Sequence, residues 1–113
     1  MDALLPSLPT LLVLRALEDG PLNGYRIARW IEQQSADILT MKEGTLYPLL
    51  HQLEKKGFLA SEWQSVDTQR KARVYSLTES GRGHLEQERK EWGVRTEIVR
   101  RVLLGGDPTH GLV

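Results

Sequence analysis

The side chains best suited to chemistry gather in residues 42–55, KEGTLYPLLHQLEK. Leu46, Leu49, Leu50 and Leu53 recur at helical spacing, so they predict a helix with one buried face. The opposite face then carries hydroxyl, amide, imidazole and ammonium groups, which bind phosphates and base edges of DNA. The first turn of a helix adds unpaired backbone N–H donors. We therefore predict that this helix contacts DNA through Lys42, Thr45, Tyr47, Pro48, His51 and Gln52.

The start of this helix is poor in strong helix formers. Thr45 can cap the helix, which would place Pro48 in the first turn, where the missing N–H of proline has no cost. Small or stiff residues at this end allow close approach to a groove, and Tyr47 extends a hydroxyl from it. A structural interpretation stays open here: Thr45 only caps the helix, and Tyr47 only covers the edge of the core.

A second group of cations follows this helix. Arg70, Lys71 and Arg73 place three positive charges within four residues. Two alternating segments, FLASEW (58–63) and RVYSL (73–77), predict a β-hairpin, and the polar, flexible segment between them predicts a long tip. We place the three cations at this tip. Such a hairpin, or wing, can lie along the DNA backbone or enter a minor groove. The alternative is an ordinary solvated turn.

Three further helices are needed to position these groups. Residues 8–18 predict a buried helix that ends before Gly20, and residues up to about 35 predict an amphipathic helix capped by Asn23. Thr78 caps a last helix that runs to about residue 104. Three helices, a β-hairpin and a fourth helix form a winged helix-turn-helix, which is mainly α with a small β-hairpin and belongs to the α+β class. We expect a DNA-binding domain at 1–77, a dimerisation helix at 78–105 and a frayed tail at 106–113.

The last helix carries a narrow apolar seam. Leu85, Trp92 and Val99 recur every seven residues, and Val102 and Leu103 extend the seam. This spacing suits a partner helix. Packing against its own domain would use part of the same seam. A two-fold dimer formed through these five residues would place two recognition helices on a palindromic site.

The composition is compatible with DNA binding but does not demand it. The 113 residues suit one domain, and 15 basic and 15 acidic residues give a net charge of zero. Residues 1–40 have a net charge of −2 and residues 41–78 a net charge of +2. The neutral total keeps open a second hypothesis, in which the winged helix binds another protein and has no specific DNA site.

No segment predicts export or a membrane. The chain has no cysteine, an acidic residue at position 2 where a signal peptide would be basic, and no run near the roughly 20 apolar residues of a membrane helix. We expect a cytoplasmic protein.

The sequence lacks the patterns of an enzyme. His51, His84 and His110 have no metal-ligand spacing, and Gly81-Arg82-Gly83 does not follow a strand of a βαβ unit. We find no P-loop or nucleophile-elbow motif. We therefore expect no catalytic activity and no cofactor or metal.

Three linked motifs resemble the PadR family of winged-helix transcriptional repressors. LPTLLVLRALEDGPLNGYRIARWIEQ (8–33) is similar to the first two helices of that family and carries its Gly-Tyr pair as Gly24-Tyr25. EGTLYPLLHQLEKKGFL (43–59) is similar to its recognition helix, and RVYSLTESGR (73–82) to its second wing strand and the start of its last helix. We add Tyr25, the tyrosine of the pair, to the predicted DNA contacts. Family members often have histidine before this pair, where Asn23 stands here.

The resemblance implies a homodimer, held mainly by the C-terminal helix, that binds inverted repeats in double-stranded DNA and represses transcription. It also suggests release by a small aromatic or cationic effector. A single C-terminal helix indicates the short form of the family. In some relatives a tryptophan of this helix lines a ligand pore, so Trp92 is a candidate effector residue, with simple dimer packing as the alternative.

Overall fold

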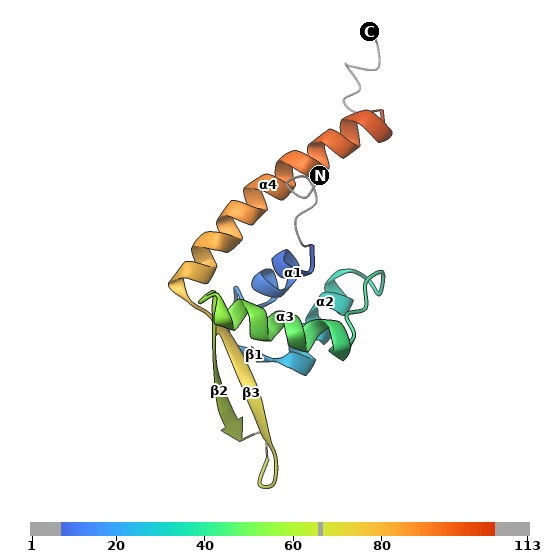
Figure 1. Ribbon diagram of the computed structural model, residues 1–113. Helices are drawn as coiled ribbons and strands as arrows, with labels where there is room; N and C mark the ends of the chain where they lie inside the picture. The colour runs from blue at the N-terminus through green and yellow to red at the C-terminus, as the bar shows by residue number, and fades with distance from the viewer. Residues whose placement is uncertain (1–7, 66, 106–113) are drawn as a thin grey trace.

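The computed structural model describes residues 8–65 and 67–105, so the predicted tail at 106–113 lies outside the described residues. The elements are, in chain order, α1 (Leu8–Ala16), β1 (Leu22–Asn23), α2 (Gly24–Gln34), α3 (Glu43–Lys55), β2 (Leu59–Ser65), β3 (Lys71–Leu77) and α4 (Glu79–Leu103) (Figure 1). This is the predicted order with one short strand added. The winged helix-turn-helix fold is confirmed.

The core lies where the first three helices meet the base of the hairpin. From α1 and the turn after it come Val13, Leu14 and Leu17, all buried. The leucine face of α3 is confirmed for three positions, Leu46, Leu50 and Leu53, which are 0–2% exposed, while Leu49 is partly buried. The remaining core members come from the other elements: Ala16, Ile27, Ile31, Met41, Leu59, Tyr75 and Leu85.

The sheet has three antiparallel strands in the order β1-β3-β2. Strands β2 and β3 form a regular hairpin in which Ser61 pairs with Tyr75 and Trp63 with Arg73. The sequence did not predict β1, because two residues are too few to show an alternating pattern. The strands also extend further than predicted, so Lys71 and Arg73 lie within β3 and not in the tip. We call β2, β3 and the turn between them the wing.

The caps of two helices are as predicted. The Asn23 side chain accepts a hydrogen bond from the Arg26 N–H at 2.8 Å, and Thr78 Oγ1 accepts one from the Gly81 N–H at 3.0 Å. The predicted Thr45 cap is wrong. Helix α3 begins at Glu43, with Lys42 as its N-cap, and the Thr45 N–H bonds to the Lys42 carbonyl within the first turn. Pro48 is consequently the sixth residue of α3 and lies inside the helix.

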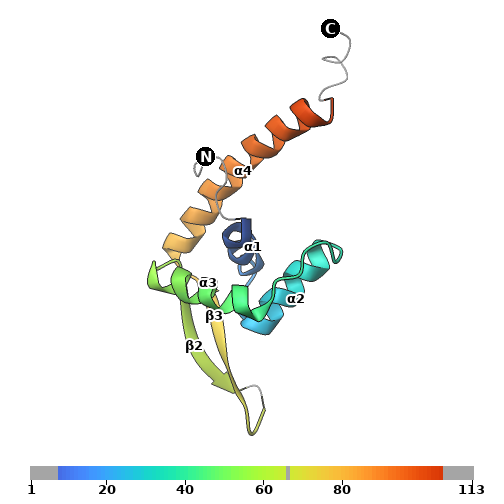
Figure 2. The same ribbon diagram turned by 45° about the vertical axis from the view of Figure 1, so that its right-hand side comes forward.

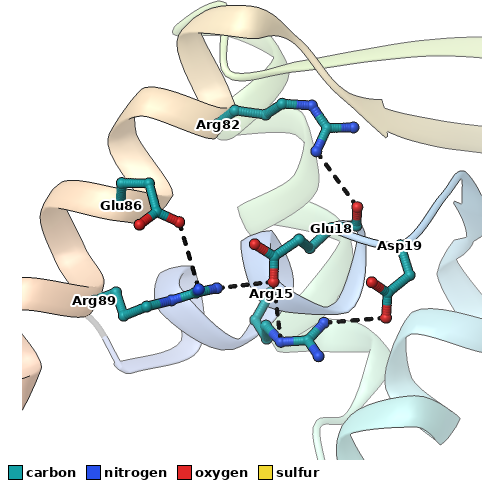
Figure 3. Close-up of polar contacts among 6 residues, drawn as sticks. All are labelled: Arg15, Glu18, Asp19, Arg82, Glu86 and Arg89. Atoms are coloured by element: carbon teal, nitrogen blue, oxygen red, sulfur yellow. Dashed lines mark hydrogen bonds and ion pairs between the residues drawn. The ribbon is translucent and has the colours of Figure 1, made fainter.

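Helix α4 runs along α1 and then continues beyond the helical body, away from the wing (Figures 1 and 2). Glu18, just after α1, joins the two helices (Figure 3). Its carboxylate accepts from Arg89 at 2.8 Å and also pairs with Arg15 at 3.2 Å, while its backbone carbonyl accepts from Arg82 at 3.4 Å. The pKa of Arg89 is raised, first by its hydrogen bond to Glu18. Two of these contacts, with Arg82 and Arg89, link Glu18 to α4, and they act together with the burial of Leu85 to hold the start of α4 against the domain.

Candidate nucleic-acid interface

Helix α3 presents its predicted polar face to solvent. The six candidate residues are all exposed, because the leucines of the same helix occupy the side that faces the core. They are Lys42, Thr45, Tyr47, Pro48, His51 and Gln52. No side chain caps the first turn, since Lys42 makes no cap hydrogen bond. Proline inside the helix also cannot donate a hydrogen bond to the carbonyl four residues earlier, that of Gly44. The start of α3 thus keeps backbone polar groups on an exposed face.

Gly24 explains how Tyr47 is placed. A Cβ atom at Gly24 would lie 2.9 Å from Tyr47 Cε1 and 3.0 Å from its hydroxyl oxygen, closer than real Cβ contacts allow. The absence of a side chain at the first residue of α2 therefore lets the Tyr47 ring pack directly on that helix. The next residue, Tyr25, is 69% exposed beside it. The Gly-Tyr pair noted in the sequence thus has a geometric role. Its glycine leaves room for the Tyr47 ring, and its tyrosine, Tyr25, is a second exposed tyrosine on the same surface.

A groove of about 1110 Å³ lies between the start of α2, Tyr47 and the wing. Its lining includes both tyrosines, the indole of Trp63 and the edge of β3. Four cations line it and, among the described residues, no carboxylate does. These cations are Arg26, Arg70, Lys71 and Arg73. Arg26 and Lys71 have no ion pair among the described residues, so this concave surface offers positive charge to an anion.

The turn of the wing is more ordered than the flexible tip predicted. The carboxylate of Asp67 accepts hydrogen bonds from the Gln69 and Arg70 N–H groups, each at 2.8 Å, and from the Arg70 guanidinium at 3.1 Å. These bonds, first that from Gln69, lower the pKa of Asp67. The Arg70 side chain is still 77% exposed, and within the described residues Lys71 has no ion pair. Both remain available to an outside phosphate.

Arg73 differs from the other two wing cations. It lies in β3, its guanidinium is 3.6 Å from the Glu54 carboxylate of α3, and it lies over the Trp63 ring at 5.4 Å. Neither Glu54 nor Trp63 was predicted from the sequence. One glutamate on a helix and one tryptophan on a strand form no pattern along the sequence that would indicate a contact. The contact forms only when β2 and β3 are paired beside α3.

A second surface lies on α4. Its C-terminal half exposes the predicted Val99, Val102 and Leu103 together with Val94 and Ile98, and Leu104, the C-cap residue, is exposed just after it. Leu85 does not belong to this surface: it is 1% exposed and packs in the core, so its predicted place in an interface is corrected.

Trp92 lies between these two regions of α4. It lines a pocket of about 290 Å³ together with Leu11, Leu12 and Leu85. Its buried indole Nε1 has no hydrogen-bond partner in the part of the chain that the structure describes. Arg15 and Arg89 also line this largely apolar pocket, whose size suits a small ligand.

The described residues bring no three His, Asp or Glu side chains together in an arrangement that could hold a metal ion. None of the helices described is long and apolar enough to cross a membrane.

Comparison with known proteins identifies the fold. Residues 13–87 match the model of the transcriptional regulator PadR-like family. The chain belongs to the PadR family. It is 37% identical over 100 residues to the transcriptional regulator Rv3488 of Mycobacterium tuberculosis, a match that covers 88% of this chain and 86% of that protein. Proteins of this family are transcriptional regulators and not enzymes.

Solved PadR structures share the architecture. A PadR family regulator of Clostridium difficile superposes with a TM-score of 0.74 at 26% identity, and the match covers 86% of this chain and 99% of that one. Bacillus subtilis PadR in complex with operator DNA superposes with a TM-score of 0.65 at 26% identity, over 71% of this chain and 45% of that one. The PadR relation therefore extends over the winged helix and its α3 face.

Proposed function

We propose that this PadR-family regulator is a dimeric repressor that binds an inverted-repeat operator in double-stranded DNA. The observation that carries the proposal is the groove between Tyr25, Tyr47 and the wing, which is lined by four cations and no carboxylate among the described residues. Of these cations, Arg26 and Lys71 have no ion pair among the described residues and Arg70 is 77% exposed, so the groove can bind an anion. The B. subtilis relative, solved with operator DNA, supports DNA as that anion.

The proposed contacts divide by chemistry. Helix α3 enters the major groove, where His51 and Gln52 can hydrogen-bond to base edges and Pro48 permits close approach. The remaining contacts position the protein on the sugar-phosphate backbone, as hydroxyl, ammonium and guanidinium groups do in most complexes. We assign this role to Tyr25, Lys42, Thr45, Tyr47, Arg70 and Lys71.

Residues 1–77 are proposed as the DNA-binding domain and 78–105 as the dimerisation helix. The support is the exposed apolar surface of α4 at Val99, Val102 and Leu103, 49–75% exposed in one protomer. Isolated exposed apolar residues are ordinary, but a continuous surface of them on one projecting helix marks an interface. Trp92, which lines the pocket on α4, is the proposed contact of a small aromatic or cationic effector.

Selection of bound duplexes from a random DNA pool at near-physiological salt tests the proposal. The expected result is an enriched inverted repeat with half-sites about one helical turn apart, 10–10.5 base pairs. Absence of enrichment, with weak binding that is lost as salt rises, would instead support the hypothesis of a winged helix that binds another protein.

The wing contact has its own test on the selected operator. Lys71→Ala should reduce the slope of log affinity against log salt by about 0.9, the value for one lost phosphate contact. Lys56→Ala is the matched control, because Lys56 is exposed at the end of α3 and does not line the groove. An unchanged slope in Lys71→Ala would remove this lysine from the interface.

A further inference from the structure

One face of the wing is turned towards α3. Ser61 and Trp63 alternate along β2, and their cross-strand partners are Tyr75 and Arg73 in β3. Side chains two residues apart on a strand share a face, so these four lie together. Tyr75, on this face, is buried in the core, which shows that the face packs towards the helices.

Glu54 of α3 contacts both strands from this side. Its Oε2 atom accepts a hydrogen bond from Ser61 Oγ at 2.6 Å, and the same oxygen lies 3.6 Å from Arg73 Nη2. One carboxylate oxygen therefore joins the recognition helix to β2 through a hydroxyl and to β3 through a guanidinium. Because the two contacts come from different strands, they restrict both the distance between the wing and α3 and the rotation of the wing relative to that helix.

The surroundings of Arg73 hold it in place. Its side chain is 39% exposed, compared with 77% for Arg70. The Trp63 ring covers it on one side at 5.4 Å, a favourable cation-π distance. Burial raises the pKa of Tyr75, Glu54 adds to the rise, and the charge of Arg73 opposes it, which is consistent with all three groups being close together.

We infer that Glu54 is a positioning residue, which fixes the angle between the wing and α3, and that Arg73 serves this contact and not a DNA phosphate. This inference rests on the proposed function, in which α3 and the wing bind one duplex at the same time. When the wing is held at one angle, Arg70 and Lys71 reach the DNA backbone only if α3 is in register with the operator bases. The bridge therefore increases the preference for the operator over other DNA.

Salt dependence distinguishes a positioning arginine from a phosphate contact. On the selected operator, Arg73→Ala should keep the wild-type slope of log affinity against log salt, whereas Lys71→Ala reduces it by about 0.9. Arg73→Ala should also lower the ratio of operator to nonspecific affinity by about two- to fivefold, the range expected from losing one partly exposed ion pair. A slope reduced in Arg73→Ala as much as in Lys71→Ala would overturn the inference.

Glu54→Gln releases Arg73 while leaving an oxygen that can accept from Ser61. The freed guanidinium can then reach a phosphate, so nonspecific affinity should rise, the salt slope should steepen by up to about 0.9 and the operator preference should fall. Glu62→Gln is the matched control: it removes the same charge from the neighbouring β2, where Glu62 is exposed and bonds only to Gln64 in the described structure. Equal effects of both variants would show a general charge effect and refute the bridge.

Wing angle can be measured without DNA. The chain has no cysteine, so spin labels at Lys56→Cys and Ser65→Cys report the separation of α3 and the end of β2. We expect a narrow distribution of label distances in the wild-type background and in Glu62→Gln, and a broad one in Glu54→Gln. The distribution in Arg73→Lys should be narrower than that in Arg73→Ala. An equally narrow distribution in Glu54→Gln would refute the bridge.

This measurement also separates the two proposals. If the wild-type protein selects no operator but Glu54→Gln broadens the distances, the bridge stands and the proposed function fails. If the operator is selected and the distances do not change, the proposed function stands and the bridge fails.

Discussion

Replacing Gly81 with alanine tests the junction between α4 and the wing. Gly81 is buried in the first turn of α4, and a Cβ atom there would lie 2.1 Å from the Phe58 carbonyl oxygen and 3.0 Å from its carbon. That carbonyl cannot easily move away, because it accepts the Thr78 N–H at 3.1 Å. The Thr78 hydroxyl holds the same place: it donates to the Gly57 carbonyl at 2.6 Å and accepts from the Gly81 N–H.

The size of the effect follows from two opposing terms. A methyl group forced into a packed site costs about 1–3 kcal/mol, and a contact of 2.1 Å with backbone belongs at the upper end. Alanine regains up to about 1 kcal/mol over glycine through helix propensity. The expected net loss of unfolding free energy is about 2 kcal/mol, which lowers the melting temperature of a domain of this size by about 10 °C.

The assay is thermal unfolding followed by circular dichroism, with Gly83→Ala as the matched control. Gly83 lies two residues further along the same helix, and a Cβ atom there would meet nothing within 4 Å. Its variant should gain about 0.5–1 kcal/mol and melt a few degrees higher. If Gly81→Ala melts at or above the wild-type temperature, the close approach of α4 to Phe58 is refuted.

The other expected outcomes concern DNA, assembly and pH. Gly24→Ala should change the melting temperature little, because the tip of the Tyr47 side chain can move. It should weaken operator binding several-fold in a mobility-shift titration. Unchanged affinity would show that Tyr47 does not contact DNA. Val99→Asp should shift sedimentation towards monomer, and a stable dimer would place the interface elsewhere. The Arg100 hydrogen bond, followed by that of Arg101, lowers the pKa of Glu97 from 4.5 to about 2. This stabilisation is therefore present above pH 4.5 and is lost as the pH falls towards 2, so a carboxyl NMR titration midpoint near 4.5 would contradict the contact.

Local patterns predicted the four helices of the described residues and two of their caps. Leucines at helical spacing identified the buried face of α3, and single polar residues before an apolar run identified the caps Asn23 and Thr78. The Thr45 cap failed because a helix start depends on backbone hydrogen bonds that a list of favoured residue types does not contain. Lys42 accepts the first bonds with its carbonyl even though its side chain caps nothing.

Contacts between distant segments were beyond the sequence patterns. The two residues of β1 form a strand only because β3 offers an edge at Val74 and Tyr75. Leu85 fits a heptad seam but is buried in the core of its own domain, so periodicity along one helix did not reveal which partner buries each position. For Gly24 the sequence did hold a signal. A glycine at a helix start, where it gives no stability, indicates that another group comes close, here Tyr47.

The two functional ends of the molecule are attached to the same helical core by different residues. Glu18 joins α4 to α1 through Arg15, Arg82 and Arg89, whereas Glu54 joins the wing to α3. In the proposed dimer, the direction of α4 sets the separation of the two recognition helices, and the angle of the wing sets how each half-site is held. Changes at Glu18 should therefore alter the preferred half-site spacing in the selected operators, while changes at Glu54 should alter discrimination within each half-site. The two carboxylates control separate properties of one interface because no side chain contacts both among the described residues.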